Sequence, residues 1–348
     1  MSDGASTELL EAEPELIATE TSLHTSVPAS YDKRLMLFAG RGSQELGTRI
    51  ADKLGIALGQ VELKTFSNGE VYCRYLESIR GADVFIVQST HDPVNRNLME
   101  LLLMIDAAKG ASAHRIIAVT PWYGYSRQDK KSSPREPISA RLVARMLETA
   151  GADRILTMHL HAGQVQGFFQ VPVDHLIARP MLTHYFIDKA VSAEYVAVSA
   201  DAGRAKLAEK FAGELGVKPA FITKHRPGHN VAEAGYVVGD VEGKAAILVD
   251  DMIDTAGTLI EAARVCRESG AAHVFAAATH GVFSGPAYER LAGPEIEEIV
   301  VTDTIPLSPG APEKIKTLSV ADILARSIRS IFTDGSVSEL FAGENQLF

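Results

Sequence analysis

The sequence predicts an α/β fold with mainly parallel sheets, and three observations support this prediction. Short apolar runs alternate along the chain with longer segments whose apolar residues recur every three or four positions. Such strand–helix alternation places helices on both faces of a parallel sheet, which makes the fold doubly wound. Many of the runs end in small, polar or charged residues, and ligands bind at the carboxyl ends of parallel strands. The length of 348 residues suggests about two domains.

The first block of the chain begins at Leu35 and contains six predicted strands. Ser43 is a candidate N-cap for a helix that runs to Leu54. Asn68-Gly69 is typical of a tight turn between two paired strands. Further helices are expected around 98–108 and up to Ala150, and the predicted strands cover 35–39, 61–66, 71–76, 84–88, 116–120 and 155–158.

A second block repeats the alternation from Tyr195 onwards. Helices are expected after Arg204, from Leu259 to a stop near Gly270, and around 320–332. The two blocks have the pattern of diverged copies of one α/β unit, although the sequence shows this only weakly. The predicted strands of this block cover 195–199, 221–224, 245–249, 274–279 and 299–302.

The most informative stretch follows the strand at 245–249. Asp250 and Asp251 stand at its carboxyl edge, and a short turn then leads into a helix. The free N–H groups and the dipole of a helix N-terminus bind phosphate, and Gly257 lets the backbone approach a ligand closely. Phosphate on the turn and sugar hydroxyls, or a metal ion, on the carboxylates would form a sugar-phosphate site. The alternative is an ordinary strand–helix turn with solvated acids.

A basic loop at 125–137 is the second candidate. Four cationic residues fall within it: Arg127, Lys130, Lys131 and Arg135. The loop follows a predicted strand end, and the planar guanidinium of Arg suits phosphate. Solvated surface charge is the equally weighted alternative.

Three polar strand ends complete the candidates. His159 and His161 would share one face of an extended strand, for metal, for phosphate or as ordinary polar residues. Asp201 precedes a small-residue turn and could hold Mg²⁺ beside a phosphate chain. Lys224 and Arg226 are alternate cations that could neutralise a transferring phosphoryl group. Pro227 and Gly228 separate His225 from His229, so a helical zinc pair is not expected there.

Composition excludes several other classes of protein. The net charge is −10, which argues against nucleic acid as a partner, while 46% apolar and 22% charged residues are ordinary for a soluble chain. Cys73 and Cys266 form no disulfide framework or metal pair, which fits a reducing cytoplasm. No apolar run is long enough for a membrane span. Residues 1–30 carry acids without Lys or Arg and are expected to be a disordered leader that catalysis does not need.

Four segments together resemble the ribose-phosphate diphosphokinase family, that is, the phosphate-dependent class of phosphoribosyl diphosphate synthetases. The resemblance covers about residues 35–341. One segment, Val249 to Thr258, is also similar to the phosphoribosyl-diphosphate motif of phosphoribosyltransferases, whereas the other three are not shared with them. Those three are Phe66-Ser67-Asn68-Gly69-Glu70, Ser126-Arg127-Gln128-Asp129-Lys130, and Leu160-His161-Ala162 with Gln164 and Gln166-Gly167-Phe168-Phe169.

The resemblance implies two similar doubly wound, mainly parallel-sheet domains of the type I phosphoribosyltransferase fold. It also implies transfer of the β,γ-diphosphoryl group of ATP to the C1 hydroxyl of ribose 5-phosphate. The products, 5-phosphoribosyl 1-diphosphate and AMP, would place the enzyme in nucleotide, histidine and tryptophan biosynthesis. Mg²⁺ as cofactor, inorganic phosphate as activator and a homo-oligomer, usually a hexamer, are further implications.

Site residues follow from the same motifs. The resemblance assigns ATP to Phe66, Asn68, Glu70, Arg127, Gln128 and Asp129, magnesium to His161 and Asp201, catalysis to Lys224 and Arg226, and ribose 5-phosphate to Asp250, Asp251, Asp254, Thr255, Ala256, Gly257 and Thr258. In the family the hairpin residues Phe66, Asn68 and Glu70 serve the adenine pocket of a neighbouring subunit.

The chain departs from the family pattern at three places. Asn68 replaces a frequent Asp, and its amide can still bind adenine. The turn after Asp201 reads Ala-Gly-Arg, without the longer Gly-Gly-containing turn, and His225 replaces a frequent Arg. The expected organisation is the leader 1–30, an ATP-side domain 31–178, a ribose 5-phosphate-side domain 179–318, and a C-terminal helix and tail 319–348 that packs back on the first domain.

Two alternatives remain from the sequence. A nucleobase phosphoribosyltransferase would explain Val249 to Thr258 but not the Arg127 loop or the Phe66 turn. A catalytically silent regulatory subunit of the same fold should have lost its charged groups, yet His161, Asp201, Lys224, Arg226, Asp250 and Asp251 are all present.

Overall fold

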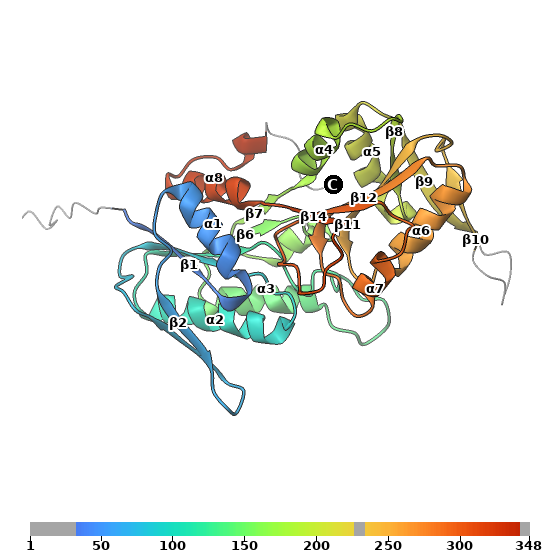
Figure 1. Ribbon diagram of the computed structural model, residues 1–348. Helices are drawn as coiled ribbons and strands as arrows, with labels where there is room; N and C mark the ends of the chain where they lie inside the picture. Colours follow the sequence, from blue (N-terminus) through green and yellow to red (C-terminus); the bar gives the residue numbers. More distant parts are fainter. Residues whose placement is uncertain (1–32, 226–233, 342–348) are drawn as a thin grey trace, which may run out of the picture. The chain divides into compact units, whose positions relative to one another are not determined.

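The computed structural model describes residues 33–225 and 234–341. The acidic leader 1–30, the end of the C-terminal tail, Arg226 and His229 therefore lie outside the described residues. Two mainly parallel β-sheets with helices on both faces, together with a separate two-stranded hairpin, make up this part of the chain (Figure 1). The predicted fold class, α/β with mainly parallel sheets, is confirmed.

The N-terminal sheet has five strands in the order β1-β4-β5-β6-β7, and every neighbouring pair is parallel. A separate antiparallel hairpin, β2 (Val61–Thr65) and β3 (Val71–Tyr75), is inserted after β1. Its turn contains Gly69 at a φ of +93°, as the Asn-Gly pair predicts. The sheet strands are β1 (Leu35–Ala39), β4 (Asp83–Val87), β5 (Arg115–Thr120), β6 (Arg154–Met158) and β7 (Val173–Leu176).

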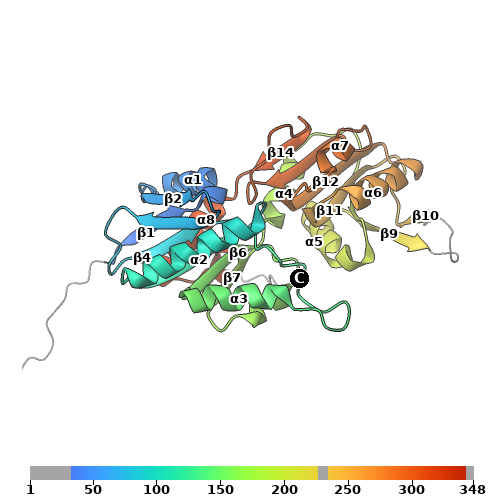
Figure 2. The same ribbon diagram turned by 90° about the horizontal axis from the view of Figure 1, so that it is seen from below.

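Alternating strand residues bury themselves against different helices because successive side chains point to opposite faces. Phe38 and Val84 pack with α2 (Val94–Gly110) and α3 (Ser139–Ala150). Leu37 and Phe85 pack on the other face with α1 (Gln44–Leu54) and α8 (Ala321–Phe332). Figures 1 and 2 show α8, from the end of the chain, beside α1.

The C-terminal sheet has seven strands in the order β10-β9-β8-β11-β12-β13-β14. All pairs are parallel except β10 with β9. The strands are β8 (Tyr195–Ser199), β9 (Pro219–His225), β10 (Ala234–Val238), β11 (Ala245–Ile253), β12 (His273–Gly281), β13 (Glu298–Thr302) and β14 (Ile315–Leu318).

Helices cover both faces of this sheet as well. Along β11, Ile247 packs in the same cluster as α4 (Arg179–Asp188) and α5 (Ala205–Leu215), whereas Leu248 packs with α6 (Gly257–Glu268) and α7 (Ala287–Leu291).

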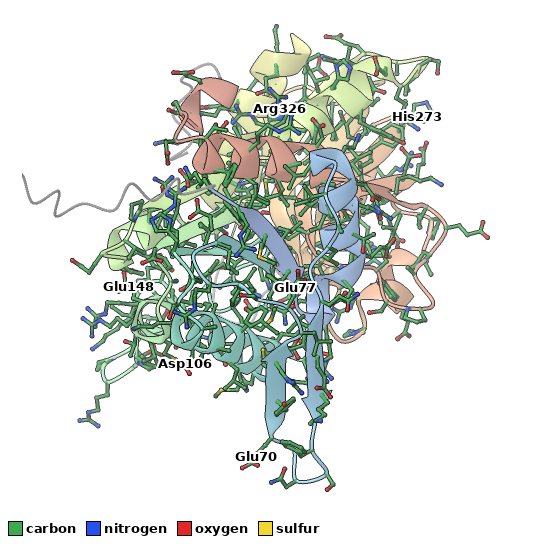
Figure 3. All side chains as sticks on the ribbon, turned by 90° about the vertical axis from the view of Figure 1, so that its left-hand side faces the viewer. Glu70, Glu77, Asp106, Glu148, His273 and Arg326 are labelled. Carbon is green, nitrogen blue, oxygen red and sulfur yellow. The ribbon has the colours of Figure 1, made fainter. Side chains whose placement is uncertain are left out.

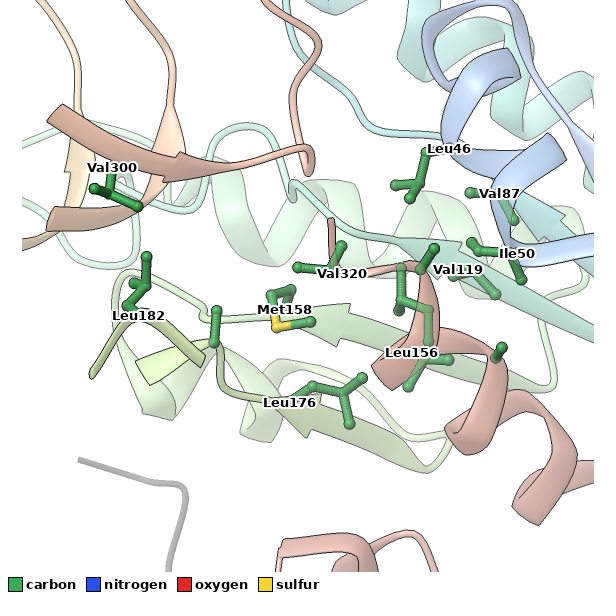
Figure 4. Close-up of a cluster of buried hydrophobic side chains, with 14 of the residues drawn as sticks. Leu46, Ile50, Val87, Val119, Leu156, Met158, Leu176, Leu182, Val300 and Val320 are labelled. Atoms are coloured by element: carbon green, nitrogen blue, oxygen red, sulfur yellow. The ribbon is translucent and has the colours of Figure 1, made fainter. Parts of the chain in front are cut away.

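One buried apolar cluster runs through both sheets. It joins Leu46 and Ile50 of α1, strand residues such as Leu156, and Val300 of β13 (Figure 4). Because their side chains share this core, the two sheets are packed together. This packing brings the strand ends that form the site described below close to one another.

Several elements differ from the sequence prediction. β11 continues through the two carboxylates to Ile253, so Asp250 and Asp251 are strand residues. Ser43 occupies the N-cap of α1, but its hydroxyl accepts from the amide of Ser89 at 2.8 Å and does not cap the helix. The sequence did not predict β7, β10, β14, α4 or α7, which are short or interrupted by polar residues. Among the described residues, no helix is long and apolar enough to cross a membrane.

Candidate functional site

The carboxyl ends of strands from both sheets meet around a polar cavity of about 220 Å³. β8 and β11 belong to the C-terminal sheet, whereas the segments carrying Arg127 and His161 follow β5 and β6 of the N-terminal sheet. The cavity is lined by Arg127, His161, Asp201, Arg204 and the consecutive residues from Asp250 to Leu259.

The turn after β11 lines this cavity and leads directly into α6. Ala256 adopts a left-handed conformation with φ +62°, which ends the strand direction and starts α6. The helical ladder begins with the amide of Ile260, which donates to the carbonyl of Ala256 at 3.0 Å. The amides of Gly257, Thr258 and Leu259 precede that bond, and the N-cap makes no side-chain cap hydrogen bond. The turn therefore has the donors and the helix dipole that bind phosphate.

Arg290 of α7 braces this turn from outside the cavity lining. Its Nη1 donates to the carbonyl of Thr255 at 2.8 Å. A β-carbon at Gly257 would come within 3.2 Å of the same Nη1, so a side chain at Gly257 would crowd the brace. Nothing in the sequence pattern singled out Arg290, because it lies 35 residues from its acceptor.

The paired carboxylates have different environments. Asp251 is 1% exposed; its Oδ2 lies 2.7 Å from Nδ1 of His161 and its Oδ1 lies 3.0 Å from Nη2 of Arg204. Burial alone would raise the pKa of Asp251, but the hydrogen bond from His161 and the charge of Arg204 hold it well below its ordinary value. Burial, followed by the neighbouring Asp251, raises the pKa of Asp250 well above its ordinary value. The pair thus combines one firmly ionised carboxylate with one that protonates readily.

His161 reaches across from the N-terminal sheet to make this contact. Its Nδ1 lies 2.7 Å from Oδ2 of Asp251 and 2.5 Å from Nη2 of Arg204, so both groups meet the ring at the same nitrogen. Arg204 lies against the same ring and donates from Nη1 to the carbonyl of His161 at 3.1 Å. Arg204 therefore contacts both the ring and the backbone of His161.

The two histidines of this segment do not share a strand face, contrary to the sequence prediction. β6 ends at Met158, and His159 has a φ of +39°, which turns the chain. Nδ1 of His159 contacts Oγ1 of Thr279 at 2.6 Å, away from the cavity lining, while His161 enters the cavity.

Of the predicted ATP residues after β5, Arg127 lines the same cavity, whereas Gln128 and Asp129 do not. Arg127 forms an ion pair with Asp254, so it links the basic loop to the turn after β11. Gln128 accepts from the hydroxyl of Ser139 at 2.5 Å, at the start of α3. Asp129 is 7% exposed and accepts from Gln164, so it holds the loop in place from within the protein.

The hairpin residues form a separate group within the described chain. Phe66, Asn68 and Glu70 are exposed at the tip of β2–β3, and Figure 3 shows Glu70 at this tip. Asn68 donates from Nδ2 to Glu70 at 2.9 Å, and Phe66 makes an edge contact with Tyr72. None of the three lines the cavity of this chain.

Asp201 follows β8 and is exposed at the cavity, where its Oδ1 accepts from the amide of Arg204 at 3.1 Å. Lys224 lies on β9, but its side chain is outside the described residues, as is the whole of Arg226. Within residues 33–225 and 234–341 no group of three His, Cys, Asp or Glu side chains could hold a metal ion by itself. Four carboxylates nevertheless line the cavity, those of Asp201, Asp250, Asp251 and Asp254, and Mg²⁺ prefers such oxygens together with phosphate and water.

Arg204 is the cavity residue whose role the sequence interpretation missed. It was noted only as part of an unusual turn, yet its Nε lies 3.4 Å from Asp250 and its Nη2 lies 3.0 Å from Asp251. The available signal was its position directly after a strand-end acid, one short turn before a helix.

The fold and the cavity define a class: doubly wound α/β proteins that bind a phosphorylated ligand at the carboxyl ends of their strands. Comparison with known proteins narrows this class. A family model for the N-terminal domain of ribose phosphate pyrophosphokinase matches residues 35–151. A model for the phosphoribosyl synthetase-associated domain matches residues 195–342.

Curated relatives agree with both models. The chain is 52% identical to a ribose-phosphate pyrophosphokinase of Caldanaerobacter subterraneus over 314 residues, which are 90% of this chain and 99% of the relative. It is 51% identical to the Clostridium perfringens protein of that name over 315 residues, again 90% and 99% of the two chains. The crystal structure of phosphoribosylpyrophosphate synthetase from Mycobacterium smegmatis has 49% identity and a TM-score of 0.83, covering 87% of this chain and 100% of that one.

The chain belongs to the ribose-phosphate pyrophosphokinase family, for which diphosphokinase is a synonym. This confirms the family that its four sequence motifs resemble.

Proposed function

We propose that this protein transfers the β,γ-diphosphoryl group of ATP to the C1 hydroxyl of ribose 5-phosphate, giving AMP and 5-phosphoribosyl 1-diphosphate. The observation that carries the proposal is the Arg127–Asp254 ion pair. It joins the basic loop characteristic of the synthetases to the phosphate turn that they share with phosphoribosyltransferases. The relatives named ribose-phosphate pyrophosphokinase support the same reaction.

Ribose 5-phosphate would bind at the end of β11. Its phosphate would accept from the backbone amides between Thr255 and Thr258 at the start of α6. Its ring hydroxyls would donate to Asp250 and Asp251, which stand on the strand just before the turn. This arrangement fixes the sugar at both ends, so that C1 has a defined direction.

ATP would lie on the side of Arg127, with Gln128 and Asp129 shaping the loop that carries this arginine. The guanidinium of Arg127 can exchange its partner Asp254 for a phosphate oxygen, because it is exposed and its fork suits phosphate. His161 and Asp201 would hold Mg²⁺ through a ring nitrogen and carboxylate oxygens, directly or through water. Bound Mg²⁺ would neutralise charge on the phosphate chain.

Diphosphoryl transfer in this reaction needs no covalent enzyme intermediate. The C1 hydroxyl oxygen attacks the β-phosphorus in line and gives up its proton to solvent, the bond between the β-phosphorus and the oxygen bridging to the α-phosphorus breaks, and AMP leaves with that oxygen. The protein contributes positioning and charge stabilisation. We assign charge stabilisation to Lys224, which lies on β9 next to β8 in the sheet, and to Arg226, two residues further along the sequence.

We also propose a homo-oligomer, most simply a hexamer, in which Phe66, Asn68 and Glu70 complete the adenine pocket of a neighbouring subunit. Their exposure at a hairpin tip supports this assignment. Inorganic phosphate is proposed as an activator. The proposed domains run from 31 to 178 and from 179 to 318, with 319–348 returning to the first; the packing of α8 on α1 supports that return.

The decisive assay supplies the purified protein with ATP, Mg²⁺ and ribose 5-phosphate and no nucleobase. We expect AMP and 5-phosphoribosyl 1-diphosphate to form in equal amounts, and the rate to respond to added phosphate. Product only from a nucleobase plus phosphoribosyl diphosphate would instead identify a phosphoribosyltransferase. An absence of turnover with intact ATP binding would identify a silent subunit.

Lys224→Ala tests whether Lys224 stabilises the charge on the diphosphoryl group during transfer. We expect kcat to fall by roughly 10³-fold while the dissociation constant of ATP changes little, because the contact strengthens in the transition state. Lys210→Ala, on α5, provides a lysine control whose rate should equal that of the parent. A Lys224→Ala enzyme with parental kcat would remove Lys224 from the mechanism.

A further inference from the structure

A buried histidine outside the cavity joins the two sheets behind it. His280 lies in β12 and is fully buried. Its Nε2 lies 3.0 Å from the carbonyl oxygen of His159, and its Nδ1 lies 2.9 Å from Oγ1 of Thr304. Trp122 packs against the ring with a centroid separation of 4.7 Å. The imidazole is thus held on both nitrogens and on one edge.

The partners of His280 define its hydrogen-bonding state. A carbonyl oxygen only accepts, so Nε2 carries the proton and donates to His159. Nδ1 then accepts from the hydroxyl of Thr304. Burial lowers the pKa of His280 to about 4, which keeps the ring neutral at physiological pH. The hydrogen bond to His159 therefore has a fixed direction.

The carbonyl that His280 holds belongs to the turn that delivers His161. His159 has a φ of +39°, in the left-handed region that L-residues seldom adopt. Two further contacts hold it: its amide donates to the carbonyl of Leu176 at 2.7 Å, and its ring meets Thr279 at 2.6 Å. Two residues later, His161 lies 2.7 Å from Asp251.

These contacts connect two residues of the site that come from different sheets. His161 follows β6 of the N-terminal sheet, whereas Asp251 belongs to β11 of the C-terminal sheet. β12 pairs with β11 directly, with His280 opposite Met252, the residue after Asp251. The hydrogen bond from His280 on β12 to the backbone before His161 therefore fixes the position of that loop relative to β11, the strand that carries Asp251.

We propose that His280 is a positioning residue, which holds the carbonyl of His159 so that His161 meets Asp251 in the geometry needed for catalysis. The inference rests on the proposed function, in which His161 serves the diphosphoryl transfer. His280 itself touches neither substrate.

Two substitutions separate this role from simple packing. His280→Leu fills the space but removes the donor, and we expect kcat to fall by roughly 10–100-fold with KM for both substrates within about threefold, since small misplacements act on the rate. His280→Gln keeps an amide donor near the position of Nε2, and its kcat should return to within about fivefold of the parent. Thr157→Val is the control: it removes a buried hydroxyl that donates to Thr120 at 2.8 Å, on the strand leading to the same loop.

A double-mutant cycle with His161→Ala gives the sharper result. If His280 acts through His161, adding His280→Leu to His161→Ala should leave kcat unchanged within about twofold, because the two effects are not independent. Melting temperatures of all variants show whether loss of rate follows loss of stability.

Three results would overturn the inference. They are a parental kcat in His280→Leu, effects that multiply in the double mutant, and a kcat loss that tracks melting temperature across all variants, Thr157→Val included. If His161→Ala lowers kcat and the losses of kcat multiply in the double mutant, the proposed function stands and only the role of His280 is contradicted. A fully active His161→Ala would instead remove His161 from the proposed function and the role of His280 with it.

Discussion

At the scale of single residues, identical side chains acquire different chemistry from their neighbours. Asp250 and Asp251 are adjacent on β11, yet only Asp251 is fully buried and bonded to both His161 and Arg204. Those partners stabilise its charge, whereas burial and the charge of Asp251 disfavour ionisation of Asp250. The sequence identified both carboxylates, but it could not rank them, because the ranking comes from residues 47 and 90 positions away along the chain.

A third carboxylate, that of Asp83, should make the stability of the protein depend on pH. It is buried at the start of β4 and binds Arg115 and His114. Burial would raise its pKa, but these partners lower the pKa below the ordinary value. Its contribution to the free energy of unfolding is therefore fully present above the unfolded pKa of about 3.9, and is lost as the pH falls through the folded value.

We expect Asp83→Asn to lower the free energy of unfolding by about 2 kcal/mol at pH 7. This is less than the usual cost of breaking a fully buried ion pair, because Arg115 is partly exposed. The difference from the parent should shrink as the pH falls below about 4. Urea denaturation between pH 3 and 7 measures this. Asp52→Asn, an exposed carboxylate on α1, is the control. A pH-independent difference would show that the charge of Asp83 is not the cause.

At the scale of elements, the strands and helices with clear apolar periodicity were predictable, and the short polar ones were not. β1, β8 and α8 follow the predicted ranges within one residue. β7 has the sequence Val-Asp-His-Leu, and tertiary pairing with β6 outweighs its weak local preference. α7 is five residues long, too short to show a helical period, although it carries the arginine that braces the phosphate turn.

Arg290→Met tests that brace. Loss of the hydrogen bond to Thr255 should loosen the turn and raise KM for ribose 5-phosphate by roughly 3–10-fold, the equivalent of about one hydrogen bond. KM for ATP should stay within about twofold, since the brace lies on the sugar-phosphate side. Steady-state kinetics with each substrate varied in turn give both values. Arg264→Met removes a surface arginine of α6 that pairs with Glu295, and it should change neither. Equal increases for both substrates would contradict a local brace.

At the scale of the whole molecule, one unit of strand, 3₁₀ turn and helix occurs twice. β1 leads through the turn Arg41–Ser43 into α1, and β8 leads through Ala202–Arg204 into α5. Both helices have 11 residues and end at a glycine in the left-handed conformation, Gly55 and Gly216. Each turn also contains an arginine that binds buried carboxylates, Arg41 with Glu100 and Arg204 with Asp251. The sequence suggested this duplication weakly, because the shared features are geometric.

Removal of residues 1–30 tests whether the leader contributes to activity. All residues of the cavity and both sheets fall at or after Lys33. We therefore expect kcat and both KM values of the truncated protein to stay within about twofold of the full chain, since the residues that form the cavity are all retained. Circular dichroism checks that the truncated protein is folded. A large loss of specific activity in a folded truncation would assign the leader a catalytic or assembly role.

The sequence alone determined the fold class and the candidate residues of β11 and its turn, because apolar periodicity and turn chemistry are local properties. It also indicated the family, because four motifs carry distinct chemistry in a fixed order. Only the tertiary structure decided that Arg127 meets Asp254, that Arg204 and His161 stabilise the charge of Asp251, and that His280 holds the turn before His161. These contacts join residues 47 to 127 positions apart. These contacts form because a shared core packs the two sheets against each other. Neither the composition of the chain nor the spacing of its motifs reveals how the sheets pack.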